Sequence, residues 1–196
     1  MENLKLYQVR YTIGDFFRGG RYLLGATAKD TCDFMSAWED GFTDIKAEEV
    51  TVVQGMDGQM PGDYLIKVVM EKEVMEEELE DVPRDMYNEK IEAEKKYVPP
   101  ADGKLRFYRS VYLNPNQIPC HEYLVGRDAR QIYNHIKTDE GGKELRGEAS
   151  DINVEEVRTE IGVIGREYGF FVFDVEVVKR LEPGDEEPEG EVYPVL

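Results

Sequence analysis

The sequence predicts an α+β fold made of a tandem duplication of one β-β-α-β-β unit, in which each copy is an antiparallel sheet with one helix on one face. Two observations lead to this class. The chain matches itself over two long stretches, and within each stretch strand-like alternation gives way to helical periodicity and then to strand-like runs again. Elements that follow one another in this way, with short turns between strands, are typical of α+β architectures.

The self-match needs two constant shifts along the chain. At a shift of 101, residues 4–11 and 22–35 fall on 105–112 and 123–136, and at a shift of 107, residues 45–50 and 64–72 fall on 152–157 and 171–179. Of these 37 aligned positions 13 are identical, where background composition would give about two or three. This excess indicates two related copies, and the larger shift implies six additional residues in a loop of the second copy.

Each copy begins with a pattern typical of a β-hairpin. Residues 4–11 alternate, Gly19–Gly20 form a turn, and residues 22–26 are a short apolar run. We expect Thr27 and Asp128 to be helix N-caps, because a side-chain oxygen there accepts hydrogen bonds from free backbone N–H groups. Each helix that follows presents one apolar stripe to the core. The stripes are Ala28, Cys32, Met35 and Trp38 in the first copy and Ala129, Ile132, Tyr133 and Ile136 in the second.

Two strands are expected after each helix. In the first copy they are residues 48–54 and 64–70, joined by the turn-forming residues 55–62, and in the second they are 154–164 and 169–178. A sheet this small has one face without a helix, and that face needs polar residues or a partner. The two copies could cover each other.

Negative charge gathers outside the two predicted units, which occupy residues 1–72 and 105–180. The chain has 42 Asp and Glu against 24 Lys and Arg, for a formal net charge of −18. The linker, residues 73–104, is acidic and expected to be partly helical. The C-terminal tail, residues 181–196, is acidic, contains Pro and Gly and has the composition of a disordered segment until its apolar end, Val192–Leu196.

Composition excludes several classes of protein. Phosphate backbones are bound by basic patches, so a chain this acidic is not expected to bind nucleic acid directly. No run of about 18 apolar residues and no basic leader is present, so we expect neither a membrane span nor secretion. Cys32 and Cys120 are too few for a disulfide framework. An intracellular, cytoplasmic location follows as the expectation, with the cytoplasm of a host cell as one version of it.

Residues that could carry chemistry lack the neighbours that chemistry needs. Cys120 and His121 are adjacent and would point to opposite faces of a strand, and His135 lies on the predicted helix. The glycine pairs lack the lysine and spacing of a phosphate loop. Glu48–Glu49 recurs as Glu155–Glu156 at a strand entrance, which suggests a structural role common to both copies. We therefore expect no enzyme activity, no catalytic residue, no metal and no cofactor.

The first strand of each copy has one face with a base and two tyrosines. Lys5, Tyr7, Val9 and Tyr11 form it in the first copy, and Arg106, Tyr108, Ser110 and Tyr112 in the second. The opposite face, with Leu4 and Leu6, is expected to meet the helix. The tyrosines would then pack between the copies or contact a protein partner, where a rigid amphipathic ring supplies area and one hydrogen bond. A stacking platform for a single strand of nucleic acid is a third interpretation, and the net charge argues against it.

The leading functional hypothesis is a non-catalytic, acidic interaction protein that binds another, basic protein, because its charge would steer such a partner toward it. The candidate contact residues are Tyr7, Tyr11, Tyr108, Tyr112, Glu76, Glu77, Glu78, Glu80, Asp81, Asp185, Glu186 and Glu187. One alternative is an inhibitor of a phage or mobile element, of the anti-defence type, that mimics nucleic acid in the basic cleft of a nucleic-acid-processing enzyme. Another is a structural component of a larger assembly.

Overall fold

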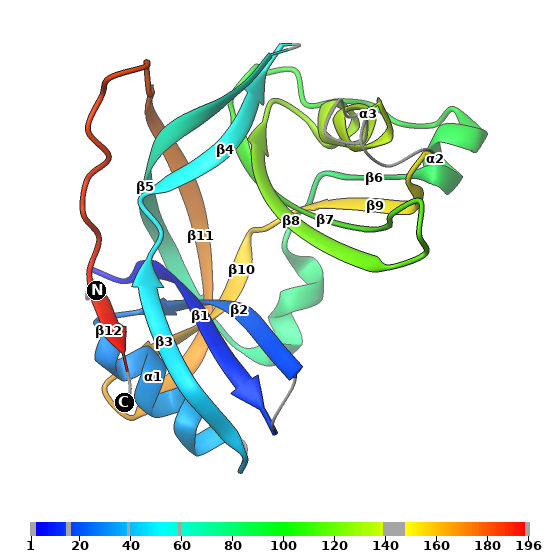
Figure 1. The fold of residues 1–196 in the computed structure, drawn as a ribbon. Helices are drawn as coiled ribbons and strands as arrows, with labels where there is room; N and C mark the ends of the chain where they lie inside the picture. Colours follow the sequence, from blue (N-terminus) through cyan, green and yellow to red (C-terminus); the bar gives the residue numbers. More distant parts are fainter. Residues whose placement is uncertain (1–2, 15–16, 39, 59, 139–147, 195–196) are drawn as a thin grey trace.

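The computed structural model describes residues 3–14, 17–38, 40–58, 60–138 and 148–194. These residues form a mixed, sheet-rich α+β fold with a few helices (Figure 1). In chain order the elements are β1 (Lys5–Ile13), β2 (Phe17–Gly25), α1 (Ala28–Trp38), β3 (Phe42–Glu49), β4 (Val52–Asp57), β5 (Met60–Val74), the 3₁₀ helix η1 (Glu76–Asp81), β6 (Met86–Asn88), α2 (Glu89–Glu94), β7 (Arg106–Leu113), β8 (Pro119–Gly126), α3 (Ala129–Thr138), β9 (Ser150–Glu156), β10 (Thr159–Ile164), β11 (Glu167–Arg180) and β12 (Val192–Pro194).

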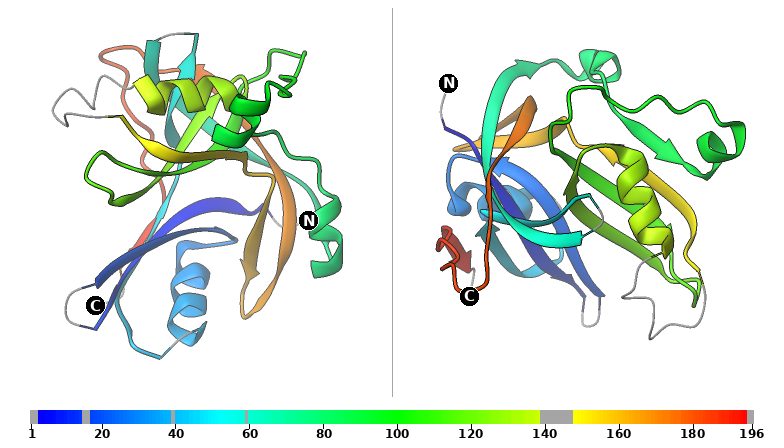
Figure 2. Two further views of the ribbon diagram at one scale, coloured as in Figure 1. Left: turned by 90° about the vertical axis from the view of Figure 1, so that its right-hand side faces the viewer. Right: turned by 90° about the horizontal axis from the view of Figure 1, so that it is seen from above.

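All twelve strands belong to one sheet in the order β12-β3-β1-β2-β10-β11-β5-β4-β8-β7-β9-β6. The long strands β5 and β11 pair at its middle and divide it into two halves of six strands. We call β12, β3, β1, β2, β10 and β11 with α1 the first half, and β5, β4, β8, β7, β9 and β6 with α3 the second half. Figure 2 shows the two halves with their helices on opposite sides of the molecule.

Each half of the sheet contains three of the strands β1–β6 and three of the strands β7–β12. After β3 the chain leaves the first half, and β4, β5 and β6 are all in the second; after β9 it returns, so β10, β11 and β12 are in the first. The two exchanged hairpins attach through parallel pairs, β10 with β2 and β4 with β8. The chain therefore crosses between the two halves twice, after β3 and after β9, so the halves are joined covalently as well as by packing.

The pairing register of one half recurs in the other. Leu6 pairs with Leu24 as Phe107 pairs with Val125, and the amide of Val50 donates to the carbonyl of Leu6 over 2.8 Å. Further contacts recur at the same two shifts of 101 and 107. The segment Asp85–Asn88 also recurs, as Glu191–Pro194, at a shift of 106 that the sequence comparison missed. We call two residues related by these shifts counterparts.

Two expectations about the strands are wrong. The strands β3, β4, β5 and β6 follow α1, and β9, β10, β11 and β12 follow α3, so four strands take the place of the expected two. The strands of the described residues also form one continuous sheet instead of one sheet per copy. The pattern of residues 48–54 predicts a single strand, but Val50 and Thr51 connect β3 in the first half with β4 in the second half. Residues 154–164 divide in the same way at Val157 and Arg158. Local periodicity cannot reveal such a crossing, because the backbone stays extended through it.

The core has three parts, and their positions reverse one expectation. The central cluster contains Leu4, Leu6 and Phe107 and is built from both halves. Tyr7 and Val9 pack under α1 in the second cluster, and Tyr108 and Leu124 pack under α3 in the third. The tyrosine face therefore meets the helix and the leucine face meets the other half. Under the helices the hydroxyls of Tyr7 and Tyr108 find the carboxylates of Glu191 and Asp85 as acceptors, which offsets the cost of burying them.

Both predicted N-caps are confirmed. The amide of Asp30 donates to Thr27 Oγ1 over 3.1 Å, and the amide of Gln131 donates to Asp128 Oδ1 over 2.9 Å. Gln131 Oε1 in turn accepts from the amide of Arg127, the residue before the N-cap of α3, over 2.9 Å. These caps fix where α1 and α3 begin over their strands.

The acidic segments contribute strands of their own. Within the predicted linker, η1 and α2 are helical and β6 pairs with β9. Within the tail, β12 pairs with β3, whereas Val195 and Leu196 of its apolar end lie outside the described residues. None of the helices in the described part of the chain has the length and hydrophobicity required to cross a membrane.

Candidate functional site

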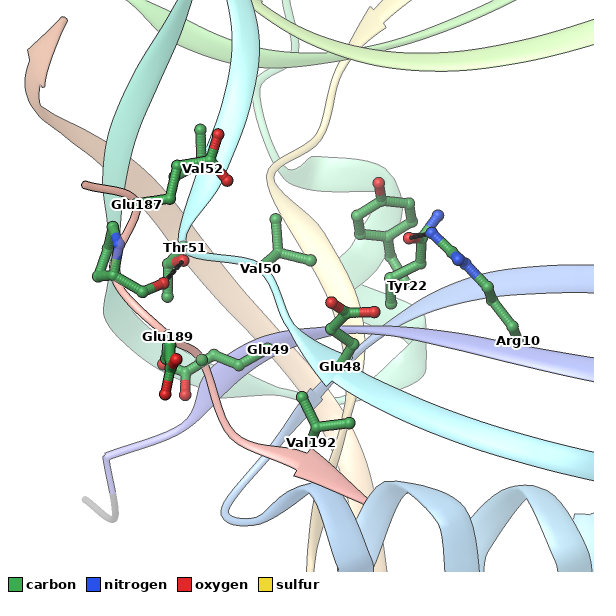
Figure 3. A pocket seen from close by; sticks show the side chains of 13 residues that line it. Arg10, Tyr22, Glu48, Glu49, Val50, Thr51, Val52, Glu187, Glu189 and Val192 are labelled. Atoms are coloured by element: carbon green, nitrogen blue, oxygen red, sulfur yellow. Dashed lines mark hydrogen bonds between the residues drawn. The ribbon is translucent and has the colours of Figure 1, made fainter. Parts of the chain in front are cut away.

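A cavity of about 490 Å³ lies on the inward face of the first half, where the chain crosses from β3 to β4. Figure 3 shows it between β1, β2 and the C-terminal tail. Its lining residues are Gln8, Arg10, Tyr22, Glu48, Glu49, Val50, Thr51, Val52, Glu187, Pro188, Glu189, Gly190 and Val192. The hydroxyl of Thr51 donates to the carbonyl of Pro188 over 3.3 Å and holds the tail against the cavity. The tail therefore forms one wall of the site.

The cavity lining is strongly negative. Four glutamates face one arginine in it, and that arginine, Arg10, donates to Gln8 Oε1 over 2.8 Å. Glu48 lies 3.5 Å from Lys46 Nζ and its side chain is 46% exposed. Among the described residues Glu187 and Glu189 make no ion pair. Glu49 Oε2 lies 2.8 Å from Lys5 Nζ. Two of the four glutamates therefore have a lysine partner, and the negative charge of the cavity is compensated only in part.

The counterpart position in the second half is occupied by arginines. Arg109 Nη2 lies 3.0 Å from Glu155 Oε2, and Arg84 donates to the other oxygen of the same carboxylate. Arg158 Nη2 lies 2.7 Å from Glu71 Oε1 and its Nη1 lies 3.9 Å from Glu156 Oε1. Under these guanidinium groups the side chain of Glu155 is only 16% exposed. Glu155 thus binds two arginines, whereas its counterpart Glu48 has one lysine at 3.5 Å and a side chain that is 46% exposed.

Three substitutions between the halves account for the difference. The counterparts of Arg109, Arg158 and Arg84 are Gln8, Thr51 and Gly190, and all three line the cavity. Glu48 and Glu49 are retained as the counterparts of Glu155 and Glu156. The cavity therefore has the carboxylates of an arginine site and lacks the arginines.

A buried acid–tyrosine pair fixes the backbone beneath each site. Tyr7 donates to Glu191 Oε2 and its counterpart Tyr108 donates to Asp85 Oδ2, both over 2.7 Å. Burial is the main cause that raises the pKa of each phenol above its ordinary value, and the accepting carboxylate adds to it. Both hydroxyls therefore remain protonated donors at neutral pH.

The floor of the cavity reaches the contact between the halves. Tyr22 stacks against its counterpart Tyr123 with ring centroids 4.0 Å apart. Burial, followed by the proximity of Tyr123, raises the pKa of Tyr22 to about 12. Because both rings are held by the other half, the cavity floor is set by the tertiary fold.

The structure brings one of the twelve predicted contact residues, Glu187, to the cavity. Tyr7 and Tyr108 are fully buried, so neither ring can reach a partner in this structure. Tyr11 is half-buried and stacks on Phe42 at 4.3 Å, and Tyr112 donates to Glu122 Oε1 over 2.8 Å. The remaining predicted residues are exposed: Glu76, Glu77, Glu78, Glu80 and Asp81 on η1, and Asp185 and Glu186 in the tail.

Sequence reasoning missed Gln8, Thr51 and Glu189, and it assigned Glu48 and Glu49 a structural role. A usable signal was present at counterpart positions that differ between the two predicted copies. Arg109 and Arg158 align with the neutral residues Gln8 and Thr51, while the acids between them are identical. An alignment scored by identity conceals this signal.

Other positions in the described residues offer less. A cavity of about 590 Å³ beside β11 has its Arg127 and Asp57 joined by a 2.7 Å hydrogen bond. His121 is exposed and His135 half-buried. The described residues contain no group of three or more His, Cys, Asp or Glu side chains with the geometry of a metal site. The acidic cavity is therefore the candidate site.

Comparison with protein-family models, with curated proteins and with solved structures gave no match.

Proposed function

We propose that this protein is a non-catalytic binding protein that takes arginine side chains of a basic protein partner into the cavity of the first half. The observation that supports the proposal is internal to the chain. In the second half Glu155 and Glu156 hold guanidinium groups, and in the first half Glu48 and Glu49 occupy the counterpart positions of an open cavity. A guanidinium supplied by another protein would meet the same acceptors.

Arginine is the expected ligand group rather than lysine. A guanidinium presents a planar fork of donors that matches a carboxylate, whereas an ammonium is a point charge with a larger hydration cost. Glu155 illustrates the arrangement, because Arg84 and Arg109 bind its two oxygens separately. The cavity volume of about 490 Å³ would accommodate more than one such side chain. The net charge of −18 would add long-range steering of a basic partner.

A tandem duplication accounts for this arrangement. We infer that residues 4–88 and 105–194 are two copies of one unit, which is supported by the recurring register and the recurring caps. In this account one copy has kept or gained its internal arginines, and in the other the carboxylates of Glu48 and Glu49 have lysine partners and no arginine. Divergence after duplication would produce two copies with the same backbone, of which only one has arginines beside its conserved pair of glutamates.

The test measures binding of a fluorescent peptide with two arginines, of sequence Gly-Arg-Gly-Arg-Gly, by anisotropy at low and moderate salt. In the variant Gln8→Arg/Thr51→Arg the first half receives the arginines of the second, and we expect peptide binding to fall at least about tenfold, which corresponds to about 1.4 kcal/mol. Glu48→Gln should weaken binding as well. The same peptide with lysines should bind the wild-type protein more weakly.

Glu76→Gln/Glu77→Gln is the matched control, because it changes the net charge by the same +2 on η1, away from the cavity. This variant should bind the arginine peptide nearly as well as the wild type at moderate salt. The nucleic-acid-mimic alternative predicts the opposite order, since it places the contact on the acids of the linker. Equal losses in the two double variants would mean that only overall charge matters, and would overturn the cavity assignment.

A further inference from the structure

The C-terminal strand lies in a groove between β3 and α1. Residues Val192–Pro194 pair with Lys46–Glu48, and Tyr193 packs on the cluster under α1. Glu191 fixes the start of the strand, because its carboxylate accepts from Tyr7 and its carbonyl accepts from the amide of Glu49 over 2.8 Å. The thiol of Cys32 donates to the carbonyl of Tyr193 over 3.4 Å. The groove thus contacts four parts of the C-terminal segment: the carboxylate of Glu191, the carbonyls of Glu191 and Tyr193, and the ring of Tyr193.

A different segment of the chain fills the counterpart groove between β9 and α3. There Asp85 takes the place of Glu191: its carboxylate accepts from Tyr108, and its carbonyl accepts from the amide of Glu156 over 2.8 Å. Tyr87 takes the place of Tyr193, is 2% exposed and packs with its ring centroid 4.8 Å from that of Tyr133. Both occupants therefore have the sequence acid, apolar residue, tyrosine.

The two occupants differ in how the chain holds them. β6 continues directly into α2, so the chain anchors it on both sides. β12 is the last strand of the described chain, and residues 181–191 before it form no helix or strand. Eleven extended residues span up to about 36 Å. Departure of the C-terminal strand breaks its pairing with β3 and the bonds of Thr51 to Pro188 and of Tyr7 to Glu191, and it leaves every other strand pair of the sheet intact.

We propose that the groove between β3 and α1 is a docking site for extended segments of the pattern acid, apolar residue, tyrosine, and that the C-terminal segment of a second copy can fill it. The structure indicates this occupant, because the groove already accommodates Glu191–Tyr193 and the counterpart groove holds the same pattern, Asp85–Tyr87. Reciprocal exchange gives a two-fold dimer. The exchanged tail brings Glu187 and Glu189 with it, so each copy completes the acidic cavity of the other.

The test uses the full chain with its own strand weakened. A fluorescent peptide of residues 186–196 is added to the Tyr193→Ala variant and to the wild type. The tethered strand competes at an effective concentration of about 1 mM, so the variant should bind the peptide one to one and at least about tenfold more tightly than the wild type. Peptides carrying Tyr193→Ala or Glu191→Gln should lose at least about tenfold in affinity for the variant.

The thiol of Cys32 gives a second readout that leaves the tail intact. In Cys120→Ser, alkylation of the buried Cys32 requires the C-terminal strand to leave. Excess peptide should slow this alkylation, because it fills the groove whenever the strand departs. Two results would overturn the proposal. One is equal affinity of the wild type and Tyr193→Ala for the peptide, and the other is a rate of Cys32 alkylation in the natively folded protein that does not change when the peptide is added. No arginine probe is involved, so either result leaves the proposed function to its own test.

Discussion

Substitution of the two buried tyrosines by phenylalanine should have unequal costs. Tyr108→Phe and Tyr7→Phe each delete one hydroxyl that donates to a carboxylate over 2.7 Å, and both rings are 0% exposed. The acceptors differ. Asp85 is half-buried and also accepts from Tyr97 and from the amide of Ala129, whereas Glu191 is exposed and water can replace its lost donor.

A hydrogen bond to a charged group contributes about 1.5–3 kcal/mol when the acceptor is shielded, and an ordinary one about 0.5–1.5 kcal/mol. We therefore expect Tyr108→Phe to cost about 2 kcal/mol and Tyr7→Phe about 1 kcal/mol. In a chain of this size each kcal/mol lowers Tm by about 2–4 °C. Both variants keep the ring, so no cavity is added to the loss.

Urea unfolding followed by far-UV circular dichroism measures the two free energies, with the slope against urea checked for constancy. Tyr97→Phe is a useful companion, because it removes a second donor from the same Asp85. Equal losses for Tyr7→Phe and Tyr108→Phe, or a larger loss for Tyr7→Phe, would refute the assignment of Asp85 as the shielded acceptor.

Three further predictions concern the interlocked halves. Gly55→Ala should destabilise the protein by about 1–3 kcal/mol in urea unfolding, because its Cβ would lie 2.0 Å from Val125 Cγ2 across the junction of β4 and β8. Gly20→Ala is the control, because its Cβ would lie 3.8 Å from the nearest atom, the carbonyl oxygen of Val9. It should change the free energy of unfolding by less than about 0.5 kcal/mol. The free energy of unfolding should fall as the pH rises from 10 to about 12, because the pKa of tyrosine is 10.0 in the unfolded chain and that of Tyr22 is about 12 in the folded protein. Absorbance at 295 nm measures tyrosine ionisation, and circular dichroism shows whether the protein is still folded. Complete tyrosine ionisation near pH 10 in a folded protein would contradict this prediction. Arg84→Gly/Arg109→Gln/Arg158→Thr gives the second half the three residues of the first and removes both arginines from Glu155. This variant should bind the arginine peptide in the second half and raise the binding stoichiometry toward two, whereas an unchanged stoichiometry in a folded variant would count against the equivalence of the two sites.

The sequence alone determined the local features of this protein. Capping depends on neighbouring residues, so Thr27 and Asp128 could be identified as N-caps from the chain itself. Helical stripes follow from a period of 3.6, and Ala28, Cys32 and Met35 of the stripe predicted for the first helix are buried. Its fourth predicted member, Trp38, is 46% exposed at the end of α1. The α+β class follows from the same local patterns.

Only the tertiary structure decided which strands pair and which face of each strand is inside. An extended backbone has the same periodicity whether it stays in one half or crosses to the other, so the passage at Val50 and Thr51 leaves no trace in the pattern. The first strand has two apolar faces, and only packing places Leu6 between the halves and Tyr7 under the helix. The cavity also depends on tertiary structure. Glu48 and Glu49 line it only because the C-terminal tail packs beside them, where β12 pairs with β3.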